Sequence, residues 1–361
     1  MLAYWIIYIY LAILSVLHLR PANASSFNPA SKGLSWYLTF LLLTLVIGLR
    51  HNVGGDWDTY QEYIYEMEGQ SLVLALAIGD PAYSLLNWVA ANYFGGIYLV
   101  NIICAAIFSW GVLALAMAQP RPWLALVVST SFLITVVAMG YTRQSVAIGL
   151  FMTSLPNLIR GQILKYIVFV MLAALFHSTA AILGFLALPE VLRRKNGVIL
   201  FLIFTFVILS ILHLTLGVHL DRLVQNYLIS DYSAGGANIR IAMVVMPAVI
   251  FLIFKNRSGM FEEEKRFWYA MSIVAFSFVI FLFFFNSAVA VDRLALYWIP
   301  LQMVVLCRLP ELIGAGSGSS HIWILLVLFY SAFVMFVWLA FADHAPFWIP
   351  YNFYPWIMFW T

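Results

Sequence analysis

The sequence predicts an all-α polytopic membrane protein, and three observations lead to that class. Of the 361 residues, 64% are hydrophobic and only 9% are charged. The mean hydropathy is +0.97, which implies more apolar surface than a soluble core of this length can bury, whereas about 20 apolar residues suffice to cross a bilayer. The apolar runs are continuous rather than alternating, a pattern typical of transmembrane helices and not of a membrane barrel.

The apolar runs delimit the expected elements. We expect about 11–12 transmembrane helices with broken or re-entrant segments and an outward-facing cavity, all within a single integral membrane domain that covers residues 1–361. The first run has neither a basic region nor a small-residue cleavage site, so we expect it to be retained as a helix. The expected spans are 2–19, 34–49, 97–117, 123–140, 144–159, 166–189, 198–216, 239–254, 267–285, 294–308 and 321–341.

The topology follows from lysine and arginine, which are enriched in cytoplasmic loops. With loop 20–33 inside, a single span over residues 166–189 would place the basic cluster "RRK" (193–195) outside. A hairpin that turns back near "FHST" (176–179) returns this cluster to the cytoplasm. Half-length helices are tolerated where their turn is buried or lines a wet cavity. We therefore favour the hairpin, with both termini outside.

The predicted topology separates the basic residues by type. Thirteen of the 18 basic residues fall inside, and no lysine falls outside. The positive-inside bias by itself can leave a few arginines outside. The alternative is that outer arginines bind an anionic ligand, because the planar guanidinium grips phosphate or carboxylate oxygens with two parallel hydrogen bonds. The outer five are Arg50, Arg143, Arg222, Arg240 and Arg293.

The stretch "RHNVGGDWDTY" (50–60) follows the second apolar run directly. Arg50 ends that span, and Gly54 and Gly55 permit a tight turn with positive φ. Asp56 and Asp58 follow on the turn. An ion pair between Arg50 and Asp56 that pins the loop is one interpretation, and it does not exclude a catalytic role for the carboxylate.

The rest of an expected outer loop, at about 50–96, contains two further elements. The stretch "WDTYQEYIYEMEG" places apolar side chains at helical spacing, which predicts an amphipathic helix on the outer leaflet. The next stretch is apolar but is interrupted by Gly79, Asp80 and Pro81. We interpret it as a re-entrant or interfacial element rather than a full span.

Five motifs occur in order along the chain and together resemble the EpsG group of Wzy-like polysaccharide polymerases. Departures from the family pattern are small: Gly55 stands where a hydroxyl residue is common, and Trp57 where tyrosine is usual. The motifs are "RHNVGGDWDTY" (50–60), "TRQSVAIGLF" (142–151), "FHSTAAI" (176–182), "VDRLALYW" (291–298) and "WIPYNF" (348–353).

The resemblance implies a glycosyltransferase that polymerises oligosaccharide repeat units carried on undecaprenyl diphosphate. Its donor and acceptor would both be lipid-linked, and its active site would face the periplasm from a multi-pass position in the bacterial inner membrane. A chain-length regulator protein is a further partner that this function allows. We expect the lipid bilayer to be the other partner, and no nucleic acid.

Such chemistry needs cations at the leaving diphosphate and a base for the attacking sugar hydroxyl. We predict that Arg50, Arg143 and Arg293 converge on the diphosphate. His177 and Asp56 are equal candidates for the base, since an ordinary histidine pKa of about 6.5 suits proton transfer near neutrality. Asp292 is a third candidate, although an ion pair with its neighbour Arg293 is equally plausible. Further predicted substrate-binding residues are Asp58, Tyr60, Gln144 and Tyr297.

The sequence contains no HExxH motif and no cluster of histidine and cysteine. The D-x-D spacing of Asp56 and Asp58 is too short to indicate a metal by itself. We therefore predict a site without metal or cofactor. The two cysteines, Cys104 and Cys307, lie in apolar runs and are expected to be packing residues.

Other functions fit the composition less well. An O-antigen ligase, or another glycosyltransferase acting on lipid-phosphate sugars, shares this architecture, but ligase-like enzymes usually carry a large late outer loop, and loop 217–238 is short. A transporter of lipid-linked oligosaccharides should show charge deep within several spans and an internal repeat. A membrane scaffold would leave the outer arginines and aspartates without a role.

Overall fold

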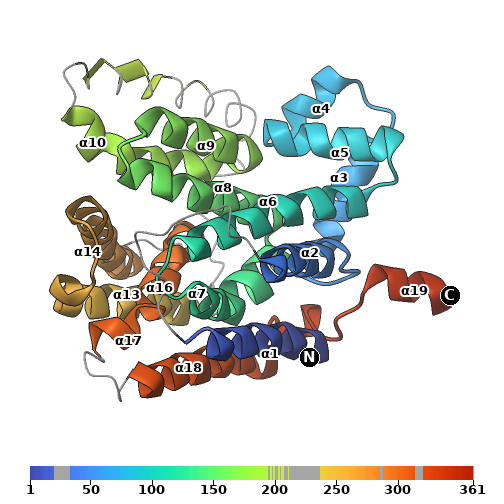
Figure 1. Ribbon diagram of the computed structural model, residues 1–361. Helices are drawn as coiled ribbons and strands as arrows, with labels where there is room; N and C mark the ends of the chain where they lie inside the picture. The colour runs from blue at the N-terminus through green and yellow to red at the C-terminus, as the bar shows by residue number, and fades with distance from the viewer. Residues whose placement is uncertain are drawn as a thin grey trace. The chain divides into compact units, whose positions relative to one another are not determined.

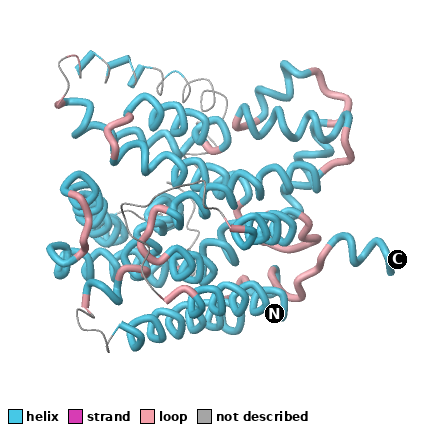
Figure 2. Tube along the Cα trace, in the orientation of Figure 1, coloured by secondary structure: helices cyan, strands magenta, loops and turns pink. Residues whose placement is uncertain are grey.

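The computed structural model describes residues 1–19, 33–193, 236–284, 288–313 and 320–360, together with a few isolated positions between 196 and 210. Of the described residues, 84% are helical. The described residues form no strand, and helices joined by short loops account for their regular structure (Figure 2). The predicted all-α class is confirmed.

Five helical segments among the described residues are long and apolar enough to cross a membrane. The chain is therefore a polytopic membrane protein, as predicted. Several shorter apolar helices accompany these segments, and three of them agree with expected spans to within a few residues: Leu2–Leu17, Leu34–Gly48 and Pro122–Ala138. The five segments are Ile97–Met117, Ala237–Arg257, Glu262–Leu282, Val289–Leu306 and Ser320–Phe341.

The chain forms two compact units that interleave in sequence. The first comprises Met1–Ala30, Leu115–Thr135 and Asp221–Pro346. The second comprises Ser31–Ala114, Val136–Leu220 and Phe347–Thr361. Whether the whole chain acts as a single membrane domain stays a prediction.

The first unit packs long apolar helices around buried ion pairs. α13 (Ala237–Phe254) contacts α14 (Glu262–Phe284) and α16 (Ile299–Leu306), while α1 (Leu2–Leu17) and α18 (Ser320–Phe341) pack on α7 (Pro122–Ser129) (Figure 1). Charges near the helix ends are paired, since an unpaired charge is costly next to lipid. Arg308 donates to Glu264 at 2.8 Å, and Arg121 donates to Glu311 at 2.5 Å. Short helices complete this unit: α15 (Ala288–Ala295), η7 (Leu296–Trp298), α17 (Leu309–Leu312) and η6 (Lys255–Arg257).

The second unit carries the expected outer elements. α3 (Trp57–Met67) matches the predicted amphipathic helix, and α4 (Leu72–Ile78) and α5 (Pro81–Tyr93) are separated at the predicted interruption. α5 packs against α3, α4 and α9 (Ile163–Phe176), and α9 packs along α8 (Thr142–Ile159) (Figure 1). Also in this unit are α2 (Leu34–Gly48) and α19 (Tyr354–Trp360). α6 (Ile97–Met117) and the π-helical η3 (Thr130–Ala138) have segments in both units.

The segment after α9 reverses direction. α9 ends at Phe176, and His177 adopts an extended conformation with φ of −154°. The following 3₁₀ helix η4 (Ser178–Ala187) packs back on α9, where Tyr166 donates a 2.6 Å hydrogen bond to the carbonyl oxygen of Leu183. α10 (Leu188–Leu192) continues it. The predicted hairpin is confirmed, and the expected single run 166–189 is two half-length helices.

The membrane sidedness of this hairpin stays a prediction, as do the positions of the termini. The expected span 198–216 and the loop 217–238, which contains Arg222, fall almost entirely outside the described residues, and so does loop 20–33.

Candidate active site

The turn after α2 depends on one of the two glycines of the first motif. Gly54 has a φ of +103°, and a Cβ added there would lie 2.2 Å from the carbonyl oxygen of Met139. Gly55 has no positive φ, and a Cβ there would meet nothing within 4 Å. The expectation that both glycines adopt positive φ is therefore wrong for Gly55. Asn52 contributes the other positive φ, of 50°, within this turn.

Arg50 lies at the centre of the turn and is only 1% exposed. Its Nη1 donates to the carbonyl oxygen of Ile47 at 2.7 Å, and its Nε donates to that of Val53 at 3.2 Å. Its Nη2 donates to the hydroxyl of Thr142 at 2.7 Å. Each guanidinium nitrogen thus has a protein acceptor, and none of these acceptors is Asp56. Arg50 therefore links the end of α2 to the start of α8 by hydrogen bonds.

The last motif closes the same turn. The backbone N–H of His51 donates to the carbonyl oxygen of Asn352 at 2.9 Å. The backbone N–H of Tyr354 donates to the carbonyl oxygen of Leu49 at 2.8 Å. Trp348 is 1% exposed and packs on Gly140, where an added Cβ would lie 2.4 Å from its ring. The first and last motifs, about 300 residues apart, therefore form one structure.

Asp80 is the centre of a charged cluster in the second unit. It precedes Pro81 at the start of α5, where its side chain makes no capping hydrogen bond and is buried, with 6% exposed. One oxygen, Oδ2, lies 3.2 Å from Nη1 of Arg143 and 3.7 Å from Nδ1 of His177. The other, Oδ1, accepts a 3.0 Å hydrogen bond from the backbone N–H of Ser178.

The contacts of Asp80 keep its carboxyl ionised. Burial alone raises the pKa of a carboxyl, because the charged form loses water. Here the charges of His177 and Arg143 and the N–H of Ser178 outweigh burial and hold the pKa of Asp80 below its usual value. The carboxylate is therefore an anion that faces one ring nitrogen of a histidine.

Two tyrosines extend the cluster toward the first motif. The guanidinium carbon of Arg143 lies 5.8 Å from the ring centroid of Tyr83, which in turn lies 5.9 Å from that of Tyr60. Tyr60 donates to Asp56 at 3.5 Å. The buried hydroxyl of Tyr83 has no hydrogen-bond partner among the described residues. Below, the Asp80 cluster means Asp80, Arg143, His177 and Tyr83.

Arg143 differs from Arg50 in what its guanidinium contacts. Its side chain is 28% exposed, and Nη1 is bound to Asp80. Within the described part of the chain, its other N–H groups make no hydrogen bond, while its flat face lies over the rings of Tyr63 and Tyr83. Arg143 therefore has donors available for an anion, whereas those of Arg50 are directed at the protein.

The structure brings some predicted residues together and leaves others apart. Asp56, Tyr60 and Gln144 lie in the second unit with the Asp80 cluster, and Gln144 is buried. Asp58 is exposed on α3. Arg293 and the fully buried Tyr297 belong to the first unit, so the convergence of three arginines stays a prediction.

Two other predictions concern Asp292 and the two cysteines. Asp292 pairs with Nε of Arg240 on α13, 52 residues away, so its neighbour Arg293 is not the partner that forms this buried bond. Both cysteines are buried and reduced, as expected of packing residues.

Asp80 and Tyr83 are the site residues that sequence reasoning missed. Asp80 was interpreted only as a helix breaker beside Gly79 and Pro81. The available signal was its charge, because an aspartate within an apolar stretch is costly unless another part of the chain supplies a partner. Tyr83 carried no signal distinct from the other 18 tyrosines.

A family model described as the EpsG family matches residues 33–353. The chain belongs to the EpsG family. The match includes all five motifs and parts of both compact units. No curated protein and no solved structure matches the chain. Membership of the EpsG family assigns this membrane protein to polysaccharide biosynthesis.

Proposed function

We propose that this EpsG-family protein is a polysaccharide polymerase of the bacterial inner membrane. It joins oligosaccharide repeat units carried on undecaprenyl diphosphate, and its active site faces the periplasm. The observation that carries the proposal is the Asp80 cluster, in which a partly exposed arginine and a histidine share one buried carboxylate.

The reaction forms one glycosidic bond and breaks one bond to phosphate. A hydroxyl of the acceptor unit attacks the anomeric carbon of the donor unit, and the bond from that carbon to the diphosphate oxygen breaks. The lipid diphosphate leaves with the bonding electrons, and the hydroxyl proton passes to a base. The site therefore needs a fixed cation for the diphosphate and a base for the hydroxyl.

Arg143 supplies the cation. Asp80 fixes one end of its guanidinium, and the aromatic rings of Tyr63 and Tyr83 support its flat face. Its remaining N–H groups can donate two parallel hydrogen bonds to a diphosphate. The buried hydroxyl of Tyr83 is a further donor beside it. Arg50 acts differently, because its contacts hold the loop that carries Asp56 and α3.

His177 supplies the base. Asp80 lies beside Nδ1, and we assign uptake of the hydroxyl proton to Nε2. The imidazolium that forms is stabilised by the carboxylate, which is already ionised. Asp56, which accepts a 3.5 Å hydrogen bond from Tyr60, is the alternative base.

Deletion of the gene, followed by gel analysis of surface polysaccharide, tests the reaction class. A polymerase predicts that the ladder of long chains disappears while a single-repeat band survives. Disappearance of both indicates a transporter or an earlier step, and an unchanged ladder contradicts the proposal. Complementation with the wild-type gene is the control.

Substitution separates the two candidate bases. His177→Gln and Asp56→Asn each keep shape and remove the ability to take up the proton. Glu66→Gln is the matched control, because Glu66 is an exposed carboxylate on α3. We expect the His177 variant to lose the ladder and the Glu66 variant to retain it. A dead Asp56 variant beside an active His177 variant assigns the base to Asp56 instead.

A further inference from the structure

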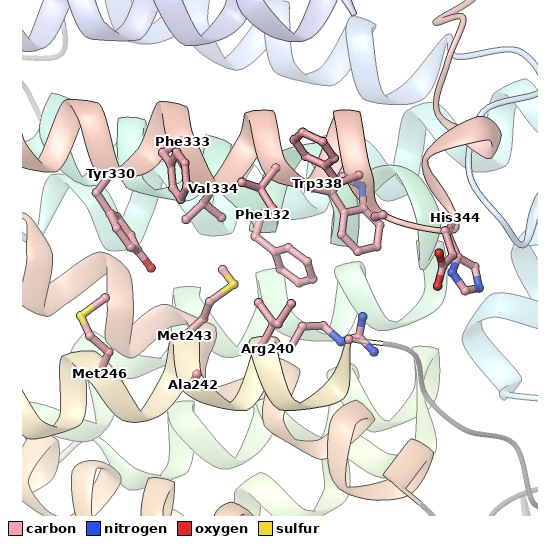
Figure 3. A pocket seen from close by; sticks show the side chains of 16 residues that line it. Phe132, Arg240, Ala242, Met243, Met246, Tyr330, Phe333, Val334, Trp338 and His344 are labelled. Carbon is pink, nitrogen blue, oxygen red and sulfur yellow. The ribbon is translucent and has the colours of Figure 1, made fainter.

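A cavity of about 560 Å³ lies in the first unit, and the residues of the Asp80 cluster are not among those that line it. Two membrane-spanning helices, α13 and α18, supply most of its lining (Figure 3). The other lining residues are Phe132 of η3, Gly236, Ala342, Asp343 and His344. Most lining side chains are apolar, among them Met243, Met246, Phe333 and Val334. Its volume falls in the range of about 300–1,000 Å³ that is usual for small-molecule sites.

The length of the cavity matches one leaflet of a bilayer. Along α18 it is lined from Tyr330 to Phe341, which corresponds to about 16 Å of helix. The hydrocarbon core of a bilayer is about 30 Å thick, so one leaflet, and one acyl chain, is about half of that. At the Tyr330 end the only hydroxyl is already engaged, because it accepts a 2.6 Å hydrogen bond from Gln302.

The polar groups gather at the opposite end. Figure 3 shows the guanidinium of Arg240 extending toward the end where His344 lies. Arg240 is 8% exposed, and its Nε is bound to Asp292. Its two terminal nitrogens have no hydrogen-bond partner within the described ranges. Asp343, also in the lining, is exposed and carries a second carboxylate.

We propose that this cavity binds one acyl chain of an aminophospholipid, with the lipid phosphate on Arg240 and the ammonium group near Asp343. The terminal N–H groups of a guanidinium fit two phosphate oxygens. Asp292 offsets the charge of Arg240, and Asp343 adds a negative charge at the same end. The site therefore favours a headgroup with both charges over a net anionic lipid. A polyprenyl chain is longer than one leaflet and exceeds the lined length.

Native mass spectrometry of the purified full chain tests the site. Delipidated protein is mixed with phosphatidylethanolamine, with phosphatidylglycerol of the same acyl chains, or with a polyprenyl monophosphate. We expect one phosphatidylethanolamine per chain to be retained in preference to the other two. Preferential retention of either other lipid overturns the assignment.

Two variants and a control locate the lipid. Ala242→Trp fills the cavity from α13 and should lower retention of phosphatidylethanolamine at least about tenfold. Ala340→Trp places the same bulk on an exposed position of α18 outside the lining and should leave retention unchanged. Equal retention by the two tryptophan variants overturns the site.

Asp343→Asn keeps an exposed side chain and removes the partner of the ammonium group. It should reduce the preference for phosphatidylethanolamine over phosphatidylglycerol by about threefold to fivefold, the size of an exposed ion pair. An unchanged preference refutes the proposed position of the headgroup even if Ala242→Trp does not fold.

Discussion

Asp80→Asn is the substitution that most directly tests the candidate site. The wild-type carboxylate contacts Arg143 at 3.2 Å, His177 at 3.7 Å and the N–H of Ser178 at 3.0 Å. Asparagine keeps the shape and the acceptor for Ser178, but its amide group donates where an anion stood. Arg143 and His177 then lose the negative charge that faces them. Asp80 is only 6% exposed, so water cannot readily replace it.

The expected effects differ in size for stability and for catalysis. A hydrogen bond to a charged group contributes about 1.5–3 kcal/mol, and the partial exposure of Arg143 places the loss at the lower end, about 1.5 kcal/mol of unfolding free energy. General-base catalysis typically raises a reaction rate by ~10²–10⁴-fold. A base that loses the anion that orients it loses a large part of this rate enhancement. Activity should therefore fall at least about a hundredfold while most of the protein stays folded.

The assay combines transfer between lipid-linked repeat units with thermal unfolding in detergent. Glu66→Gln is the matched control, since it also replaces a carboxylate by an amide, at an exposed position. If Asp80 acts through His177, the Asp80→Asn/His177→Gln double variant should be no less active than the worse single variant, because the two residues act as a unit. Near wild-type transfer by Asp80→Asn, or additive losses in the double variant, refutes the reasoning.

Four further predictions concern the same unit. Gly54→Ala should lower the unfolding free energy by about 1–3 kcal/mol, because the strained φ and the contact with a carbonyl oxygen both oppose a Cβ, whereas Gly55→Ala should leave thermal unfolding unchanged. Arg50→Lys should lower the melting temperature, because lysine cannot donate to three acceptors in the guanidinium geometry. Arg143→Lys should leave the melting temperature nearly unchanged and lower the transfer rate, measured as released lipid diphosphate. Equal losses of melting temperature in the two arginine variants would show that both residues have a structural role. Because the pKa of Asp80 is lowered in the folded state, the ionised carboxylate stabilises the fold fully above about pH 4. This stabilisation should be lost as the pH falls through the folded-state pKa of Asp80. Acid titration of Asp80→Asn should not show this loss.

Much of the fold follows from the order of apolar and polar residues. The expected spans, the amphipathic helix after Trp57 and the interruption at Gly79 to Pro81 were all readable, because lipid leaves helices as the only practical form for long apolar runs. The reversal at His177 was readable as well, from a basic cluster that a single span would have placed outside. These features depend on local sequence and on the bilayer as a solvent.

The site was only partly readable. Sequence reasoning named Arg143 and His177 but treated Arg50 and Arg143 as equivalent, since both are arginines at the ends of apolar runs. It also could not pair Asp292 with Arg240, because their separation of 52 residues exceeds any local pattern. Sequence reasoning expected positive φ at both glycines, whereas of the two only Gly54 has it.

The sequence by itself determined the membrane class, the helical elements and the residue types available for chemistry, because hydrophobicity and helix length are properties of contiguous residues. Only the tertiary structure decided which charges meet. Asp80 contacts Arg143 and His177, which lie 63 and 97 positions later in the sequence. Because Asp80 is buried, its charge has to be offset by groups that the fold brings next to it. A buried charge must be satisfied wherever the chain brings an opposite charge, and folding alone sets which one that is.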